Sequence, residues 1–245
     1  MKTISSLLLA IALTTTVAYG QEEINRELSS FNKVVASPRI NLVLQKGDQE
    51  SIRLVYADVD ASKINIQVKG HTLRIYLDDA RVVEKNQRVS KHYKHSIYTD
   101  VNITAYVTYK EIKHLEIRGQ QDVSCKDPLS AKKFTLKAYG ENEIELASIK
   151  TEYFKTALYG ENKVNVRGGR ADYQKYKLYG ENKIDTRALK SFSATTTIFG
   201  ESKVKLSTQD ELKVNSFGES EVRYNGDAHV NRGLVFGNAS ITRIN

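Results

Sequence analysis

Several residue types and motifs are scarce or missing from this sequence of 245 residues, and each absence narrows the possibilities. Cys125 is the single cysteine, so no internal disulfide can form, and we expect a small buried apolar residue there rather than a reactive thiol. After residue 20, no apolar run approaches the length of a membrane-spanning helix. The Gly-x-Ser-x-Gly, phosphate-loop and dinucleotide motifs are all missing. The sequence therefore predicts neither a membrane span nor a catalytic residue.

The remaining composition is that of a folded domain. Tryptophan is absent and proline occurs twice, but there are 14 tyrosines and 14 glycines. Hydrophobic residues make up 40% of the chain and charged residues 27%, which excludes a disordered chain. The length is sufficient for one large β-domain or two small ones.

Residues 1–20 have the features of a secretory signal peptide. Lys2 provides the positive start, Leu7–Leu13 is a short apolar run, and Ala18–Gly20 places small residues at the cleavage site. The apolar run is too short to span a bilayer. We therefore expect an exported protein, located in the periplasm or at the cell surface, whose mature chain begins at Gln21.

The charge of the mature chain is moderately positive. Loss of the signal peptide removes one of the 37 basic residues and none of the 29 acidic ones, which leaves a net charge of +7. This charge suits contact with acidic polysaccharides or lipid surfaces, and it equally suits simple solubility. We expect no nucleic acid among the partners.

A seven-residue segment centred on glycine recurs along the second half of the chain. It is clearest in Ala138–Ile144, Leu158–Val164 and Leu178–Ile184, which read AYGENEI, LYGENKV and LYGENKI. The central glycines of all copies are Gly119, Gly140, Gly160, Gly180, Gly200, Gly218 and Gly237, spaced 21, 20, 20, 20, 18 and 19 residues apart. Such a repeat indicates an array of stacked structural units.

The period of the repeat separates the possible folds. Propeller blades and helical repeats are longer, and the frames of leucine-rich and calcium-binding repeats are missing. Between the glycines, apolar and polar residues alternate as in a strand, for example over Lys133–Lys137. We therefore predict an all-β protein in which residues 116–245 form a right-handed parallel β-helix, a solenoid with coils of about 20 residues.

The alternation also assigns each residue of the repeat to a side of the coil. In Leu158–Val164 the first residue and every second one after it should face inward, and stacking should align equivalent residues about 4.8 Å apart. The expected interior columns are Ile144, Val164, Ile184, Val204, Val222 and Ile241, and an amide ladder of Asn142, Asn162 and Asn182 that Ser202 and Ser220 continue. The glycines should form a corner that requires positive φ or close backbone approach.

Two outward columns are the candidate ligand-binding surface. The aromatic column comprises Tyr139, Tyr159, Tyr179, Phe199, Phe217 and Phe236, and the acidic column comprises Glu141, Glu161, Glu181, Glu201 and Glu219. The aromatic column is either a platform for sugar rings or a stacked ladder that only stabilises the coils. The predicted ligand-binding residues are Tyr139, Tyr159, Tyr179, Phe199, Glu141, Glu161 and Glu181.

Metals and cofactors are not expected. The acidic column could bind divalent cations, but Lys163, Lys183 and Lys203 run beside it and favour a solvated ladder of mixed charge. His92 and His95 have a metal-like spacing, but no acidic or cysteine pattern completes a site, so a surface loop is the preferred interpretation.

The first half of the chain lacks the glycine repeat. Residues 21–30 are polar and predict a flexible leader, and residues 31–115 predict an N-terminal β region. Its expected strands are Ile40–Leu44, Ser51–Tyr56, Lys63–Val68 and Thr72–Leu77. This region is either an antiparallel cap or the first irregular coils of the solenoid, because an open end would expose apolar core and unpaired edges. Residues 81–98 predict an exposed basic loop.

The order of these features resembles a known family. After the signal peptide come Phe31–Val35, Leu44–Asp48 and Gly70–Ile75, and then the glycine-centred segments. Residues 31–245 are similar to the head GIN domain of autotransporter adhesins, secreted proteins common in Bacteroidetes. The resemblance implies a right-handed β-helix-like fold and a surface-associated location, and it carries over no catalytic residues. Most family members place small residues around the glycine, where this chain has Tyr-Gly-Glu-Asn.

Three functions fit the sequence. The first is a non-enzymatic, adhesin-like binding module of the cell envelope, whose partner is a polysaccharide or an envelope protein. The second is a structural or assembly scaffold with no small ligand. The third and least favoured is a polysaccharide lyase or hydrolase, because such enzymes need converging acids, whereas the glutamates here repeat in coil after coil.

Overall fold

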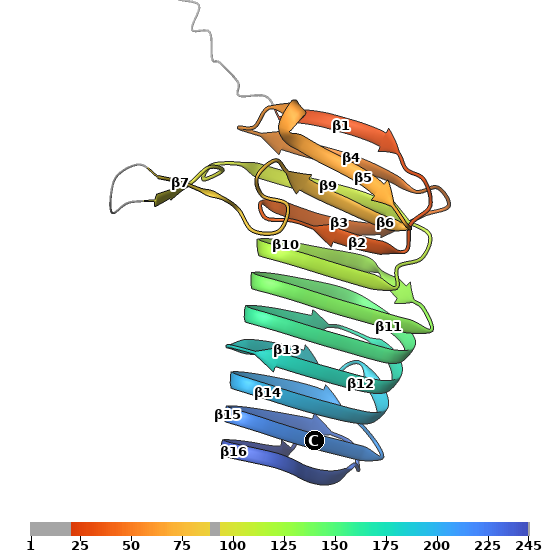
Figure 1. Ribbon diagram of the computed structural model, residues 1–245. Helices are drawn as coiled ribbons and strands as arrows, with labels where there is room; N and C mark the ends of the chain where they lie inside the picture. The colour runs from red at the N-terminus through yellow and green to blue at the C-terminus, as the bar shows by residue number, and fades with distance from the viewer. Residues whose placement is uncertain (1–20, 89–93, 245) are drawn as a thin grey trace, which may run out of the picture.

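The computed structural model describes residues 21–88 and 94–244; the expected signal peptide 1–20 and His92 lie outside this part. Strands stack along one axis, from an N-terminal group around β1 (Glu22–Glu27) and β4 (Ser51–Ala57) down to β16 (His229–Arg243) (Figure 1). The predicted β-solenoid is confirmed. No helix in the described part is long and apolar enough to cross a membrane.

The second half of the chain forms the regular coils. They are built from strands paired in parallel with the equivalent strands of the neighbouring coils. The strands are β10 (His114–Ser130), β11 (Lys133–Val166), β12 (Gly169–Tyr179), β13 (Asn182–Thr186), β14 (Lys190–Ser207), β15 (Glu211–Asn225) and β16 (His229–Arg243). Their registers align Gly119 with Gly140 and Gly200 with Gly218, so the glycine segments stack as predicted.

The glycine corner depends on a conformation that only glycine tolerates. Gly160 has a φ of 101°, and a Cβ placed there would lie 2.4 Å from the carbonyl oxygen of Gly140 in the coil above. The other six glycines of the column also have positive φ. Each coil can therefore bend while its backbone lies directly on that of the next coil.

The interior columns are mostly as predicted. Val164 and Ile184 are buried, and so is every aligned residue from Ile144 to Val222. Ile241 is only partly buried, because it belongs to the last described coil and has no neighbour below it. Cys125 is buried as predicted, 3.4 Å from the Tyr109 hydroxyl, and burial raises the pKa of its thiol.

One interior feature was not predicted. Three fully buried polar residues of one coil face one another: the Tyr176 hydroxyl lies 2.8 Å from Thr186 Oγ1 and also donates to the amide oxygen of Gln174. The Gln174 amide nitrogen donates to the carbonyl of Ser207 at 3.1 Å. The cluster satisfies its own hydrogen bonds, so it replaces apolar packing inside this coil without leaving unpaired groups.

The N-terminal region combines the two arrangements that the sequence left open. β2 (Lys33–Ala36) and β3 (Ile40–Lys46) pair in parallel with β10, and β6 (Thr72–Leu77) and β9 (Asn102–Tyr109) continue these stacks. β4 (Ser51–Ala57) and β5 (Ile64–Lys69) then pair antiparallel with β9 and β6. Parallel coils thus begin before residue 116, and antiparallel strands close the end.

Residues 21–30 are not a flexible leader. Glu22–Glu27 forms β1, an antiparallel partner of β4. The Tyr56 hydroxyl donates to Glu22 at 2.7 Å, and Arg53 pairs with Glu23 at 3.0 Å. A polar strand is stable here because β4 offers an otherwise unpaired edge, which the sequence of the leader does not reveal.

The segment 81–98 is only partly the exposed loop that was predicted. It includes a short hairpin of β7 (Asn86–Arg88) and β8 (Lys94–Ser96), which projects sideways from the stack (Figure 1). At its base, however, Glu84 is half-buried and Tyr98 is buried. The base of the hairpin is therefore part of the folded body.

Candidate ligand-binding surface

The aromatic column is a continuous stack of rings. Neighbouring ring centroids from Tyr139 to Phe217 lie 4.7–4.9 Å apart with interplanar angles of 2–6°. Phe236 extends the stack at 5.5 Å and 17°. Every ring belongs to the residue just before a corner glycine, and the strands that carry these residues pair in parallel and in register. Each ring is therefore held above the equivalent ring of the next coil.

Stacking decides which part of each ring a ligand can reach. The faces of the inner rings are covered by their neighbours, so the solvent-facing groups are ring edges and hydroxyls. Tyr159 and Phe199 are 37% and 36% exposed. Among the described residues, none forms a hydrogen bond with the hydroxyls of Tyr139, Tyr159 or Tyr179. The stack therefore presents a row of free hydroxyls rather than a platform of ring faces.

A charged group covers the upper end of the stack. The guanidinium carbon of Arg118 lies 5.0 Å from the centroid of the Tyr139 ring, as expected for a cation–π contact. Glu116 fixes this guanidinium through a 2.8 Å hydrogen bond from Arg118 Nε. The hydrogen bond with His114 and the pairing with Arg118 lower the pKa of Glu116 to about 2.

The asparagine ladder lies behind the corner, as predicted. Asn162 Nδ2 donates to Asn182 Oδ1 at 3.1 Å and to the Tyr159 carbonyl at 3.3 Å. Below it, the Ser202 hydroxyl accepts from the Asn182 backbone at 3.2 Å. The ladder holds the peptide that carries each aromatic ring, and so it fixes the spacing of the stack.

An open groove runs along the other side of the corner. Its upper part has a volume of about 510 Å³ and its lower part about 450 Å³, and the two share Glu181 and Lys183. All five glutamates of the acidic column line this groove: Glu141, Glu161, Glu181, Glu201 and Glu219. The predicted aromatic and acidic residues therefore lie side by side, on the two flanks of one corner.

The lysines beside the acidic column do not neutralise it directly. Lys163 pairs with Glu143 of the coil above at 2.5 Å, within its own column, and not with Glu161. Within the described part of the chain, none of the five column glutamates forms an ion pair. No described group of three or more histidine, cysteine or acidic side chains could hold a metal ion.

A second hollow, of about 430 Å³, was not predicted. It lies between the base of the hairpin and the upper end of the stack, and Val82, Val83, Arg118 and Tyr139 are among its lining residues. Val83 is 75% exposed. The sequence signal for this hollow is the pair of adjacent valines, Val82 and Val83, in a charged segment. Their position beside Tyr139, however, depends on the fold.

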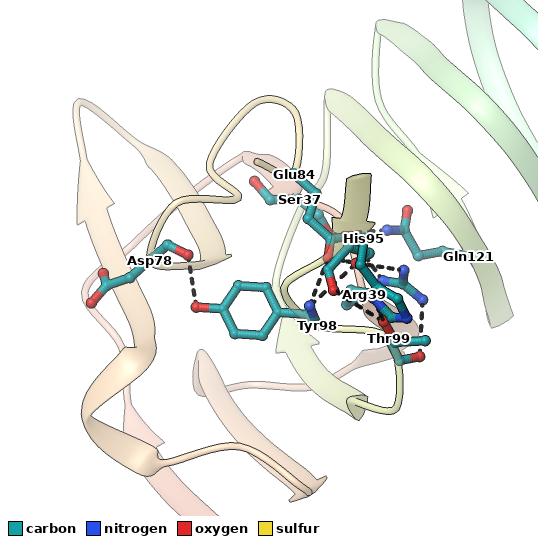
Figure 2. A network of polar contacts seen from close by, with 9 residues as sticks. Ser37, Arg39, Asp78, Glu84, His95, Tyr98, Thr99 and Gln121 are labelled. Atoms are coloured by element: carbon teal, nitrogen blue, oxygen red, sulfur yellow. Dashed lines mark hydrogen bonds and ion pairs between the residues drawn. The ribbon is translucent and has the colours of Figure 1, made fainter. Parts of the chain in front are cut away.

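A polar network holds the hairpin base in this position (Figure 2). Arg39 Nε donates to Glu84 at 2.9 Å, and the backbone of Tyr98 donates to the same carboxylate at 2.9 Å. The Tyr98 hydroxyl donates to the carbonyl of Asp78 at 2.8 Å. Burial alone would raise the pKa of Glu84, but the hydrogen bonds from Ser96, Arg39 and the Tyr98 backbone outweigh it and lower the pKa. The second hollow therefore has a fixed wall.

The comparison with known proteins begins with a protein family. Residues 30–228 match the family described as "Putative auto-transporter adhesin, head GIN domain". The chain belongs to this family. The resemblance that the sequence showed to this family is thereby confirmed. The matched residues include the N-terminal region from β2 onward and leave out β1. No curated protein matches the chain.

Solved structures share the fold of this head GIN domain. A "putative adhesin" from Bacteroides fragilis has a TM-score of 0.77 at 16% identity, with 93% of this chain and 98% of that chain covered. A "putative adhesin" from Parabacteroides distasonis has a TM-score of 0.67 at 13% identity, with 92% and 97% covered. A "Putative lipid binding protein" from the same organism has a TM-score of 0.65 at 14% identity, with 92% and 97% covered. At these identities the similarity concerns the fold alone.

Proposed function

We propose that this head GIN domain is an exported, non-enzymatic binding module of the cell envelope, located in the periplasm or at the cell surface. Its ligand is a polysaccharide or another envelope protein. The contact residues are the stacked Tyr139, Tyr159, Tyr179 and Phe199 and the neighbouring Glu141, Glu161 and Glu181. Export is supported by the apolar run Leu7–Leu13 and by the adhesin family.

The observation that carries the proposal is the row of tyrosine hydroxyls that have no hydrogen-bond partner among the described residues. Tyr139, Tyr159 and Tyr179 place three such groups in a straight line, with rings 4.7–4.8 Å apart. The groove beside them offers carboxylates at the same repeat. Regular donors and acceptors suit a ligand that is itself extended and repetitive, and the rigid stack pays little conformational entropy on binding.

A scaffold is the second candidate, because the stack is also a sufficient source of stability. Each inner ring contacts two others, and stacked pairs stabilise by about 0.5–1.5 kcal/mol beyond the area that they bury. In that case the ladder would hold the coils together and the hydroxyls would contact only water.

The non-enzymatic assignment is supported by the sameness of the acidic residues. Acid–base hydrolysis of a glycoside needs two carboxyl groups in different environments, one of which stays protonated. The five glutamates of the acidic column are all exposed and lie at equivalent positions of successive coils. None of them is distinguished as a proton donor.

The test compares two triple variants at Tyr139, Tyr159 and Tyr179 on an array of bacterial and host polysaccharides, with and without calcium. Tyr→Phe at all three keeps the stack and removes the hydroxyls, whereas Tyr→Ala removes both. The binding module predicts calcium-independent binding that the Tyr→Phe variant loses at unchanged thermal stability. Unaltered binding in both variants would refute the contact residues. The scaffold would be favoured if the parent protein bound no glycan and no envelope protein co-purified with it, while the Tyr→Ala variant was less stable than the parent.

A further inference from the structure

The side of the solenoid that leads into the glycine corner carries lysines outside the repeated segment. We name as the lysine face the five outward-facing side chains of Lys133, Lys137, Lys155, Lys175 and Lys177. The pairing of β11 with β12 places Lys155 directly above Lys175 and Ala157 above Lys177. Five cationic side chains therefore lie on one side of three neighbouring coils.

Ion pairs do not balance this charge in the described part of the chain. Within the described residues, none of the five lysines forms an ion pair. The acids next to the face are already engaged. Glu116 pairs in register with Lys137 but binds Arg118, Glu152 lies 3.9 Å from Lys132, and Asp172 lies 3.8 Å from Arg170. The lysine face is thus a patch of net positive charge whose lysines have no ion-pair partner among the described residues.

The opposite flank of the corner shows that the chain can balance its charges. There, Glu143 pairs with Lys163 at 2.5 Å, and Arg167 pairs with Glu145 at 2.9 Å. On the lysine face, by contrast, Lys133 and Lys175 lower the pKa of Lys155 by their repulsion. Like charges placed directly opposite each other destabilise a sheet. A polyanionic ligand would relieve the repulsion and turn it into binding energy.

Aromatic rows border the lysines on both sides. Tyr159 and Tyr179 belong to the stack next to the corner, and Tyr153 and Tyr173 lie on the far side. The rings of Tyr153 and Tyr173 meet edge to face at 6.4 Å, and Tyr153 is 45% exposed. Unlike the stacked rings, this pair leaves ring surface open for the apolar side of a sugar.

We propose that the lysine face binds a linear acidic polysaccharide, one whose sugars carry carboxylate or sulfate groups. The inference rests on the proposed binding role but changes the contact residues, since a polyanion would bind the lysines and the flanking tyrosines and not the glutamate groove. The ammonium groups pair with the acidic groups, and the flanking tyrosines contact the sugar rings and hydroxyls. A bilayer surface fits less well, because between Lys133 and Tyr179 the outward positions of this sheet carry lysine, tyrosine, threonine and Ala157 rather than a row of large apolar side chains.

The binding test uses two forms of one polymer. Polygalacturonate and its fully methyl-esterified form have the same backbone and differ in charge, and dextran sulfate and dextran provide a second such pair. We expect the purified protein to bind both polyanions in isothermal titration calorimetry, with affinity that falls as salt is added, and to bind neither neutral polymer as tightly. Equal binding to the charged and esterified forms, or no binding to either polyanion, would overturn the proposal.

The location is tested with charge-matched variants. Lys155→Gln/Lys175→Gln should weaken binding to polygalacturonate about tenfold, because two charge contacts are lost. Lys183→Gln/Lys203→Gln is the control, since it removes the same charge from exposed lysines of the groove. An equal loss in both variants would assign binding to net charge alone and overturn the site. Thermal unfolding checks that both variants are folded.

Two further measurements separate the alternatives. The first is sedimentation with anionic phosphatidylglycerol vesicles, to which we expect no binding through Lys155 and Lys175. If the protein bound the vesicles but neither polyanion, and Lys155→Gln/Lys175→Gln abolished that binding, the ligand of the lysine face would be a lipid surface and the proposal would be wrong. Binding of a neutral glycan that depends on the Tyr139, Tyr159 and Tyr179 hydroxyls but not on the lysines would refute this inference and leave the proposed function intact.

Discussion

Asn142 donates a hydrogen bond from its side-chain amide to the side-chain oxygen of Asn162, one coil below, at 2.8 Å. Both side chains are buried, at 4% and 2% exposure. Since the same amides also donate to the carbonyls of Tyr139 and Tyr159, the ladder joins the interior of the corner to the aromatic stack outside it. The stability of the corner and the geometry of the candidate site are therefore coupled.

Replacing Asn162 tests this coupling. Asn162→Ala leaves the Asn142 amide without its acceptor in the next coil and removes the donor to Asn182, so we expect a loss of about 2–3 kcal/mol in the free energy of unfolding. Chemical denaturation measures it. Asn162→Ser should lose less, because Ser202 and Ser220 occupy the same position in later coils. Equal stability of the alanine variant and the parent would show that the ladder is dispensable.

The glycine corner predicts a contrast between two glycines of one coil. In Gly160→Ala the new Cβ would lie 2.4 Å from a carbonyl oxygen at a φ of 101°, so we expect destabilisation of about 3 kcal/mol or failure to fold. In Gly168→Ala the nearest atom would be 3.5 Å away without positive φ, and stability should change little. Thermal unfolding compares the two. Similar melting temperatures would contradict the close backbone approach.

The aromatic stack predicts that ring contact matters more for stability than the hydroxyl. Tyr159 stacks on Tyr139 and Tyr179 at 4.8 and 4.7 Å, so Tyr159→Ala should cost about 2–3 kcal/mol, and Tyr159→Phe should cost almost nothing. Urea denaturation of both variants gives the values. The stack would not be a source of stability if Tyr159→Ala unfolded at the same urea concentration as the parent.

The pairing of Glu116 predicts a specific acid sensitivity. Its pKa is lowered from 4.5 to about 2, so the folded state binds this proton less readily than the unfolded chain does. The stabilisation is fully present above pH 4.5 and is lost as the pH falls towards 2. Glu116→Gln should lower stability at pH 7 and flatten its decline between pH 5 and pH 2, as measured by unfolding across that range.

The control for this effect is Glu141→Gln, which changes an exposed glutamate without an ion pair. It should leave the acid profile unaltered. The same steep decline in Glu116→Gln as in the parent would mean that another carboxylate determines the acid sensitivity.

The repeat made most of the fold predictable. The corner glycines and the inward side of Val164 followed from the repeat and its fixed period. The strands around Ile40, Ser51 and Thr72 lie outside the repeat and followed from the alternation of apolar and polar residues alone. Such patterns are local, and each additional copy reinforces the same assignment. Stacked coils then align equivalent residues without any further information.

Features that depend on distant partners could not be predicted in this way. β1 exists because β4 offers an edge, and Glu84 is held by Arg39, 45 residues away. The direction of the Tyr159 ring, face to face with its neighbours, was one of two open possibilities. The lysines of the lysine face lie outside the repeated segment, so the repeat does not predict that they align on one face.

The sequence by itself thus determined the solenoid, its period and the two sides of each coil, because alternation and glycine conformation act within a few residues. Only the tertiary structure decided how the end is closed, which groups of the aromatic column reach solvent, and where positive charge is left unpaired. Those properties depend on distances between side chains in different coils, and Lys155 and Lys175 become neighbours only when the coils have stacked.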